Sequence, residues 1–319
     1  MKKKIVFFGS SDFSAEVLKY LIDTNHEIVL LITQPDKPFG RKRKLKATRA
    51  KEIAIESQIE VYQPNSLKKL DPFYKLRDLD YDFGVVVAYG KIIPQRILDT
   101  ASISYLNGHA SDLPRWRGAA PIERAIMSGD SSTAMCIMKM TAALDEGDVL
   151  FRDEVKISDQ MGFKDLENKL LESCKINLEK CIHQYKEKLS KSCAQSIEGI
   201  TYAEKIYKDV SYIKISSDSA ITIYNRIRGL ENSYGAVFSF EGKKFAVYSA
   251  KLSLKDGLSG QGGIIDLTKK SFGIALKGGV LYPQEVQLEG KKRMAVQSFM
   301  SGSRLDKETC FESFEVKNG

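Results

Sequence analysis

The sequence predicts an α/β protein in which a doubly wound, mostly parallel sheet is followed by a smaller β-barrel, OB-like domain. Two observations predict this fold class. In the first half of the chain, short apolar runs alternate with stretches whose apolar residues recur at helical spacing, as expected for parallel strands joined by helices. In the second half, the apolar runs become short strands separated by turns that contain glycine, which is typical of a small barrel.

Each element of the first half follows from its local pattern. The continuous apolar run DFGVVVA at 82–88 indicates a central strand that is covered on both faces. Ser11 or Asp12 provides an N-cap for the first helix. We expect strands over 4–8, 27–33, 60–62, 82–88, 102–107 and 135–140, and helices over 13–22, 49–57, 121–127 and 162–188.

The length of 319 residues suits two domains, each able to bury a core. The pattern breaks into Ser, Lys, Gln and Gly near residue 190, and we interpret 190–205 as a linker between a first domain, 1–189, and a second, 206–319. In the second domain, we expect a helix over 220–228 and strands over 236–240, 244–248, 263–266, 273–276 and 279–287.

Composition excludes several classes of protein. The five cysteines form no C-x-x-C pair, which argues against a disulfide framework or a zinc site and predicts a cytoplasmic protein. The first apolar run, 5–8, is too short for a signal peptide, and no stretch has the length of a membrane span. We therefore expect neither a metal nor a membrane partner.

The glycine pattern and the histidines narrow the function further. The first strand is followed by Gly9-Ser-Ser-Asp12, and the G-x-G-x-x-G pattern of dinucleotide-binding oxidoreductases is absent. His26 and His183 lie in polar surroundings and are expected on the surface, without metal-ligand spacing. His109 is the remaining histidine with a candidate chemical role.

A basic segment suggests a polyanionic partner. Eight Lys or Arg residues and no acid lie between Lys37 and Lys51, and Pro35, Pro38 and Gly40 favour a loop. Such a segment is either a solvated loop or a contact for nucleic acid. Because the net charge is +8 and residues 201–319 hold 18 Lys and Arg against 13 Asp and Glu, the sequence favours nucleic acid.

The stretch LNGHASDLPRWRGAAP at 106–121 contains candidate catalytic residues. It follows a predicted strand, at the sheet edge where open α/β folds bind their ligands. Asn107 and His109 are two residues apart, so in an extended chain they point to the same side. Asp145, in ALDEGD at 143–148, follows another strand and can return to pair with His109. The alternative is that Asn107 caps a turn and His109 is a core residue.

These residue types suit the transfer of an acyl group between two nitrogens. The reaction passes through a tetrahedral intermediate with a negative oxygen, which Asn107 or His109 can stabilise by donating hydrogen bonds. One nitrogen loses a proton and the other gains one, which requires groups that act as acid and base. A carboxylate paired with an imidazole, as predicted for Asp145 and His109, serves that purpose.

The stretch resembles the motif N-x-H-x-S-L-L-P-[RK]-[WY]-R-G of the 10-formyltetrahydrofolate-dependent formyltransferases, and LDEGD at 144–148 resembles their L-D-x-G-D motif. RWRGAAP at 115–121 is most similar to the members that act on methionyl-tRNA. Segments 33–45, 85–90 and 287–294 resemble their basic tRNA-contacting loop, the edge of their pterin pocket and their carboxyl-terminal P-x-G-K-K-x-M signature.

The resemblance implies that a Rossmann-like catalytic domain, 1–189, and a tRNA-binding barrel, 206–319, act as a monomer. It implies formyl transfer from 10-formyltetrahydrofolate to the amino group of methionyl-tRNA, for translation initiation. Asn107 and His109 would stabilise the oxyanion, and Asp145 would orient His109 and move the proton. The implied folate contacts are Ser111, Asp112, Leu113 and Pro114, and the implied tRNA contacts are Arg41, Lys42, Arg43 and Lys44.

Some positions depart from the family pattern. Gly108 replaces a β-branched residue, Ala110 stands where Gly is common, and Asp112 replaces an apolar residue. Residues 229–236 lack the family's N-P-W-P pattern. Two alternatives remain: a formyltransferase for a small amine, such as an amino-sugar nucleotide, and an RNA-binding protein that has lost catalysis.

Overall fold

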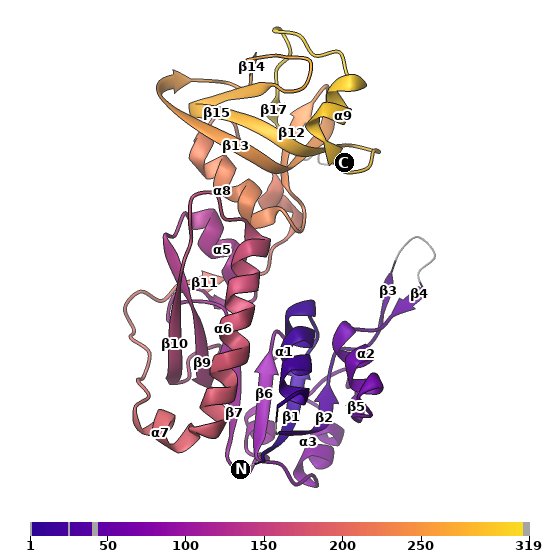
Figure 1. Cartoon of the computed structure of the whole chain (residues 1–319), viewed down its shortest axis with the longest axis vertical. Helices are drawn as coiled ribbons and strands as arrows, with labels where there is room; N and C mark the ends of the chain where they lie inside the picture. Colours follow the sequence, from indigo (N-terminus) through magenta and orange to yellow (C-terminus); the bar gives the residue numbers. More distant parts are fainter. Residues whose placement is uncertain (1, 25, 40–43, 315–319) are drawn as a thin grey trace. The chain divides into compact units, whose positions relative to one another are not determined.

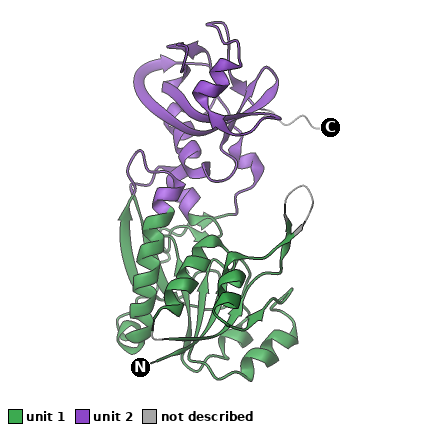
Figure 2. Ribbon diagram, turned by 45° about the vertical axis from the view of Figure 1, so that its right-hand side comes forward, with its two compact units in different colours: residues 1–121, 132–156, 167–204 green, residues 122–131, 157–166, 205–319 purple. Residues whose placement is uncertain are grey.

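The computed structural model describes residues 2–24, 26–39 and 44–314, in two compact units (Figure 2). The first unit comprises residues 1–121, 132–156 and 167–204. The second comprises residues 122–131, 157–166 and 205–319, so it includes most of helix α5 (Pro121–Ser128) as well as the carboxyl-terminal part of the chain.

The first unit is built on a seven-stranded sheet (Figure 1). In spatial order its strands are β10 (Val149–Lys156), β9 (Ser132–Lys139), β7 (Ser104–His109), β6 (Phe83–Val87), β1 (Lys4–Gly9), β2 (Glu27–Ile32) and β5 (Val61–Tyr62). The five strands from β7 to β5 run parallel, whereas β9 and β10 add an antiparallel edge. The predicted doubly wound, mostly parallel sheet is confirmed.

Helices cover both faces of this sheet. On one face, α3 (Leu70–Arg77) and α4 (Gln95–Leu98) bury Leu76 and Ile97 against Val6 and Phe8 of β1. On the other lie α1 (Asp12–Ile22) and α6 (Phe163–His183), drawn in front of the sheet in Figure 1. Ser11 is the N-cap of α1, and α2 (Arg49–Glu56) follows β2.

Several boundaries differ from the prediction. The helix expected over 162–188 breaks at Gln184 into α6 and α7 (Tyr185–Ser190), and Tyr185 just after the break packs edge-on against Phe83. Strand β7 starts at Ser104 and continues to His109, so it is shifted by two residues from the strand expected over 102–107 and has the same length. Strand β10 and helices α3 and α4 were not predicted; β10 is a half-exposed edge strand, and α4 has only four residues.

The basic segment is flanked by a short antiparallel ladder where a loop was expected. Strands β3 (Lys37–Phe39) and β4 (Lys44–Lys46) pair, with Lys37 opposite Lys46. Proline is tolerated in β3 because the strand lies at an edge and Pro38 needs no ladder donor there.

The second unit contains a curled antiparallel sheet. Its strand order is β14 (Ile264–Ile265), β15 (Gly273–Leu288), β13 (Lys243–Ser259), β12 (Ala236–Phe240) and β17 (Glu312–Ser313), with β16 (Met294–Ala295) beside β15. The strands expected over 273–276 and 279–287 are one continuous strand. Gly278, at φ +81°, is a local irregularity within the ladder rather than a turn.

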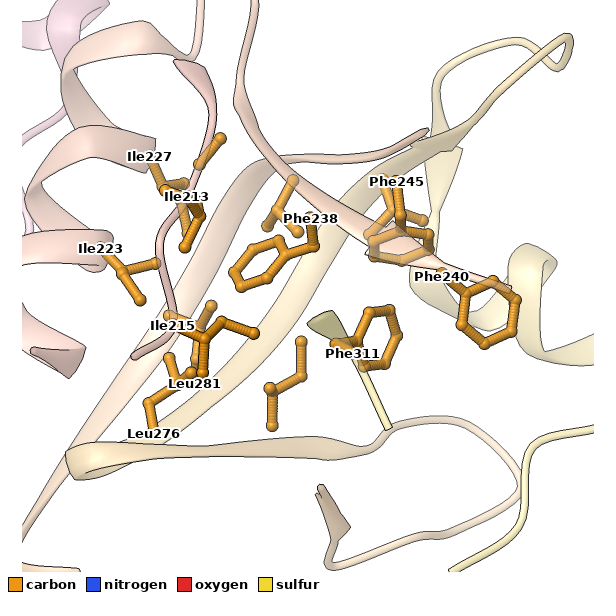
Figure 3. Close-up of a cluster of buried hydrophobic side chains, with 14 of the residues drawn as sticks. Ile213, Ile215, Ile223, Ile227, Phe238, Phe240, Phe245, Leu276, Leu281 and Phe311 are labelled. Carbon is orange, nitrogen blue, oxygen red and sulfur yellow. The ribbon is translucent and has the colours of Figure 1, made fainter. Parts of the chain in front are cut away.

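An aromatic core holds the second unit together (Figure 3). Phe238, Phe245 and Phe311 have no exposed surface, and Phe240 stacks on Phe311 with ring centroids 5.2 Å apart. Each buried phenylalanine stabilises the fold by roughly 2 kcal/mol through the apolar surface it removes from water. The remaining helical elements of this unit are α8 (Ala220–Leu230), which lies over the core, the 3-10 turn Lys208–Ser211 and α9 (Val296–Ser301).

His26 is buried, which corrects the expectation that it lies on the surface. Only 6% of the residue is exposed, and its ring packs 4.7 Å from that of His183, centroid to centroid. Neither ring nitrogen of His26 has a hydrogen-bond partner among the described residues. His183, by contrast, is exposed, with Nε2 3.8 Å from Glu179. Burial lowers the pKa of His26, and the neighbouring His183 acts in the same direction.

We predict that the first unit loses stability as the pH falls through the range below 6.5. The pKa of His26 is depressed in the folded state, so the folded protein binds fewer protons than the unfolded chain below the unfolded pKa. Stability is therefore complete above pH 6.5 and falls at lower pH, by at most about 1.4 kcal/mol per pH unit. Urea unfolding between pH 5 and pH 8 measures it. The His26→Phe variant should show a flatter pH profile, and parallel profiles would contradict the prediction.

Candidate active site

Asn107 and His109 lie together at the carboxyl end of β7. Both are buried, with 8% and 6% of the residue exposed. Both contact one group, the carboxylate of Asp145: Asn107 Nδ2 donates a hydrogen bond to Oδ1 at 3.2 Å, and His109 Nδ1 lies 3.7 Å from Oδ2. The structure thus brings together the three residues that the sequence predicted as catalytic.

Asp145 is held in a constrained backbone conformation. It lies in the loop between β9 and β10 at φ +51°, in the left-handed region that few side-chain-bearing residues adopt, Asp among the more tolerant. The backbone N–H of Gly118 donates to Asp145 Oδ2 at 2.9 Å. The carboxylate therefore accepts hydrogen bonds from two separate segments, which satisfies a largely buried charge.

The two ring nitrogens of His109 have different surroundings. Nε2 lies 3.0 Å from the carbonyl oxygen of Trp116. A carbonyl only accepts, so this contact places a proton on Nε2. The separation of 3.7 Å between Nδ1 and Asp145 is longer than a hydrogen bond. Nδ1 is consequently the ring nitrogen that can face a ligand while Asp145 stays nearby.

A segment that the sequence analysis treated as linker completes the site. We call residues 193–203 the strap. In β11 (Tyr202–Ala203) it pairs with β8 (Arg117–Gly118). Thr201, just before β11, accepts two further hydrogen bonds at 2.9 Å: its Oγ1 accepts from Trp116 N, and its carbonyl oxygen accepts from Arg117 N. The strap positions the two backbone groups that contact His109 and Asp145. Its sequence offered little signal, because isolated polar residues carry these contacts.

The predicted folate loop, 111–114, follows β7 directly. Ser111 is fully buried, and its hydroxyl has no hydrogen-bond partner among the described residues. Leu113 packs against β9, and the Leu113–Pro114 peptide bond is cis. A buried hydroxyl beside the three clustered polar groups suits a polar ligand atom, because buried polar groups are normally hydrogen-bonded.

Asp112, which departs from the family pattern, has a charged partner in this chain. Arg152 of β10 donates from Nε to Oδ1 at 2.5 Å and from Nη2 to Oδ2 at 2.7 Å. This two-bond contact raises the pKa of Arg152. The departure therefore fastens the loop to the neighbouring edge strand in place of an apolar contact.

The turn after β6 lies beside these residues, since Val86 and Val87 pair with Asn107 and Gly108. Ala88 and Gly90 adopt positive φ values, +44° and +74°, and Gln34 Nε2 donates to the carbonyl of Tyr89 at 2.8 Å. This turn is the segment that resembles the family's pterin-pocket edge.

Arg41, Lys42 and Arg43, predicted to contact tRNA, lie outside the described residues. Lys44 begins β4, and the structure describes only its backbone. Lys37, Lys46 and Arg49 from the flanks of this segment line a cavity of about 400 Å³, together with Asp12 and Glu52.

Among the described residues, no group of three or more His, Cys, Asp or Glu is placed to hold a metal ion. Nor does any described helix combine the length and apolar character needed to cross a membrane.

The fold and the sequence together define a class of enzyme. Residues 3–182 match the family described as Formyl transferase, and residues 205–304 match its C-terminal domain. The protein is a formyl transferase with both domains of that class.

Curated relatives narrow the class. A methionyl-tRNA formyltransferase from Francisella philomiragia is 39% identical over 311 residues, covering 96% of this chain and 98% of its own. Those from Alcanivorax borkumensis and Rickettsia bellii are 36% and 35% identical, over 94% of this chain and 91% and 96% of their own. The chain belongs to the methionyl-tRNA formyltransferase family.

Solved structures agree on the fold. A sugar 3N-formyl transferase, WlaRD, solved with dTDP and 5-N-formyl-THF, matches with a TM-score of 0.64 at 15% identity, over 92% of this chain and all of its own. HypX from Aquifex aeolicus, solved with tetrahydrofolic acid, matches with a TM-score of 0.64 at 13% identity, over 94% of this chain and 47% of its own. At such identities the likeness concerns the fold alone.

The structure explains the glycine at 108. A Cβ there would lie 2.8 Å from Cys174 Sγ of α6 and 3.3 Å from Met135 Cε. The fully buried Cys174 thus occupies the space that a β-branched residue would need, and burial raises the pKa of its thiol to about 12. Gly108 and Cys174 form a matched pair across the sheet and α6.

We predict that Gly108→Ala destabilises the first unit by about 1 to 3 kcal/mol, because the added methyl group overpacks the contact with Cys174. The double variant with Cys174→Ala should recover part of this loss, since it removes Sγ. Urea unfolding of the four members of the cycle measures the coupling. Additive effects would show that the two residues do not compete for the same space.

Proposed function

We propose that this enzyme transfers the formyl group of 10-formyltetrahydrofolate to the amino group of methionyl-tRNA, for translation initiation, with Asn107, His109 and Asp145 as its catalytic residues. The observation that carries the site assignment is the single carboxylate, Asp145, in contact with both Asn107 and His109. The relatives named methionyl-tRNA formyltransferase, which match over nearly their whole lengths, support the acceptor.

Each side chain has a distinct task in this reaction. The amide of Asn107 donates to the formyl oxygen, on which negative charge develops as the amine attacks, and Nδ1 of His109 donates to the same oxygen when both ring nitrogens carry a proton. The bond from the formyl carbon to the amine nitrogen forms, and the bond to the folate nitrogen breaks. Asp145 takes up the proton that the amine loses, and the folate nitrogen gains a proton from the same cluster. His109 stays oriented through Trp116 and Asp145.

The formyl donor fits the loop beside the catalytic cluster. We assign Ser111, Asp112, Leu113 and Pro114 to its binding. The unpartnered, buried hydroxyl of Ser111 supports this assignment, and the ion pair between Asp112 and Arg152 holds the loop in place.

We assign the acceptor tRNA to the basic segment with Arg41, Lys42, Arg43 and Lys44 and to the carboxyl-terminal domain, 206–319, which follows the catalytic domain 1–189 and the linker 190–205. Lys37, Lys46 and Arg49 beside that segment supply further positive charge for phosphates. We propose a cytoplasmic monomer; the five free cysteines are in keeping with a reducing compartment.

We predict that Asp145→Asn lowers the rate of formyl transfer at least about 100-fold, because the amide cannot take up the proton. His109→Ala should have a similar effect. The assay incubates each variant with 10-formyltetrahydrofolate and methionylated initiator tRNA and scores formyl-methionine.

The matched control is Asp80→Asn. Asp80 is an exposed carboxylate that pairs with Lys4 at the amino end of the parallel strands, away from the site, so its removal should leave turnover unchanged. Wild-type turnover by Asp145→Asn would refute the site assignment. An amino-sugar nucleotide offered to the wild-type enzyme in a parallel reaction tests the acceptor, and preference for the sugar would overturn the assignment to tRNA.

We predict that tRNA affinity falls steeply with salt and that neutralising residues 41–44 flattens this dependence. For every phosphate that the variant no longer binds, the slope of log K against log salt should decrease by roughly 0.7 to 0.9. Filter binding between 50 and 300 mM salt (about the range over which such interactions weaken) measures it. The control neutralises the exposed Lys180 and Lys186 of α6 and α7. Equal slopes in the wild type and the 41–44 variant would remove this segment from the interface.

A further inference from the structure

Gln195, in the strap, contacts the loop that carries Asp145. Its Nε2 donates to the carbonyl oxygens of Asp145 at 2.8 Å and Gly147 at 2.9 Å. Its Oε1 accepts from Arg117, from Nε at 3.1 Å and Nη2 at 2.8 Å. Ala194 and Ser196, its neighbours in the chain, are exposed, so Gln195 alone of these three turns its side chain inward.

These hydrogen bonds fix which end of the amide points where. Carbonyl oxygens accept hydrogen bonds only, and a guanidinium group donates only. Exchanging the oxygen and nitrogen of Gln195 would set acceptor against acceptor at Asp145 and Gly147, and donor against donor at Arg117. A glutamine at this position satisfies all four hydrogen bonds, whereas the isosteric glutamate satisfies only those to Arg117.

The loop needs this support because its backbone conformation is unfavourable. Asp145 is at φ +51°, a conformation that the surroundings must maintain. On one side the loop lies against β9, so closely that a Cβ at Gly147 would collide with the carbonyl oxygen of Lys139. On the other side, Gln195 binds the carbonyl group of Asp145 itself.

Arg117 extends the same support. It is buried, with 4% of the residue exposed, and its Nη1 lies 3.0 Å from Glu146 Oε1. Gln195 therefore binds residues 145 and 147 directly. Residue 146 is bound by Arg117, whose guanidinium group Gln195 orients. The residue after Arg117 in the chain, Gly118, donates to the carboxylate of Asp145.

We infer that Gln195 is a positioning residue for formyl transfer, which sets the direction of the Asp145 carboxylate through the backbone of residues 145–147. The inference rests on the proposed function, because the rate it affects is that of formyl transfer. It assigns to the segment that joins the two family-matched ranges, 3–182 and 205–304, a role in catalysis.

Two substitutions separate this role from general support of the fold. Gln195→Glu keeps the oxygen for Arg117 and removes both donors to the Asp145 loop, whereas Gln195→Met removes all four hydrogen bonds. Glu198→Gln, an exposed change on the same strap, is the matched control. We expect kcat to fall about 10- to 100-fold in both Gln195 variants, as for a small misplacement of a catalytic group. KM for either substrate should change by less than about threefold.

A double variant shows whether the effect passes through Asp145. In an Asp145→Asn background, Gln195→Glu should cause little further loss of rate, because residues that act as a unit are not additive. Full kcat in Gln195→Glu, or the same fold-loss in the Asp145→Asn background as alone, would overturn the inference. So would a lower melting temperature with kcat unchanged.

Hydrogen exchange of residues 143–148 gives a readout that needs no turnover. Faster exchange of this loop in Gln195→Glu, but not in Glu198→Gln, supports the inference, and unchanged exchange overturns it. If the wild-type enzyme fails to formylate methionyl-tRNA, the proposed function fails, and this exchange measurement still decides whether Gln195 holds the loop.

Discussion

The carboxylate of Asp145 joins segments that are far apart in the chain. It accepts from the side chain of Asn107 on β7 and from the backbone of Gly118 on β8, and it faces the ring of His109. A largely buried carboxylate is stable only where donors replace the water it has lost. The parallel sheet supplies the first of these donors at its carboxyl edge, and the strap holds the second in position, so the geometry of the site depends on keeping this one group in place.

The sheet and the polar pair on β7 were predictable because both follow from patterns local to a few residues. The alternation of apolar runs with stretches of helical spacing predicted the parallel strands. The two-residue spacing of Asn107 and His109 predicted that their side chains point to the same side. Asp145 lies 36 residues beyond His109 in a left-handed turn, and its place after another strand suggested the pairing that its motif then supported. The strap escaped prediction because its contacts come from single polar residues, Gln195 and Thr201, with no apolar period.

Two of the departures from the family pattern, Gly108 and Asp112, are each explained by a partner residue on another element. Gly108 replaces a β-branched residue, and Cys174 fills the space beside it. Asp112 replaces an apolar residue, and Arg152 binds both of its oxygens. A sequence read position by position shows one member of each pair and not its partner, because the partners lie on other elements. His26 was misjudged for the same reason: its polar neighbours in the chain gave no sign of the ring of His183.

The strap also bears on how proteins of this architecture can diversify. Residues 167–204 belong to the first unit, although the last of them follow its long helix α6 by some distance in the chain. A recombination event that joined a new carboxyl-terminal domain near residue 190 would import a foreign strap and separate Gln195 and Thr201 from the segments they bind. Exchange at 204 would keep them. The contacts that position the Asp145 loop therefore extend to residue 203, just before the second family-matched range begins at residue 205.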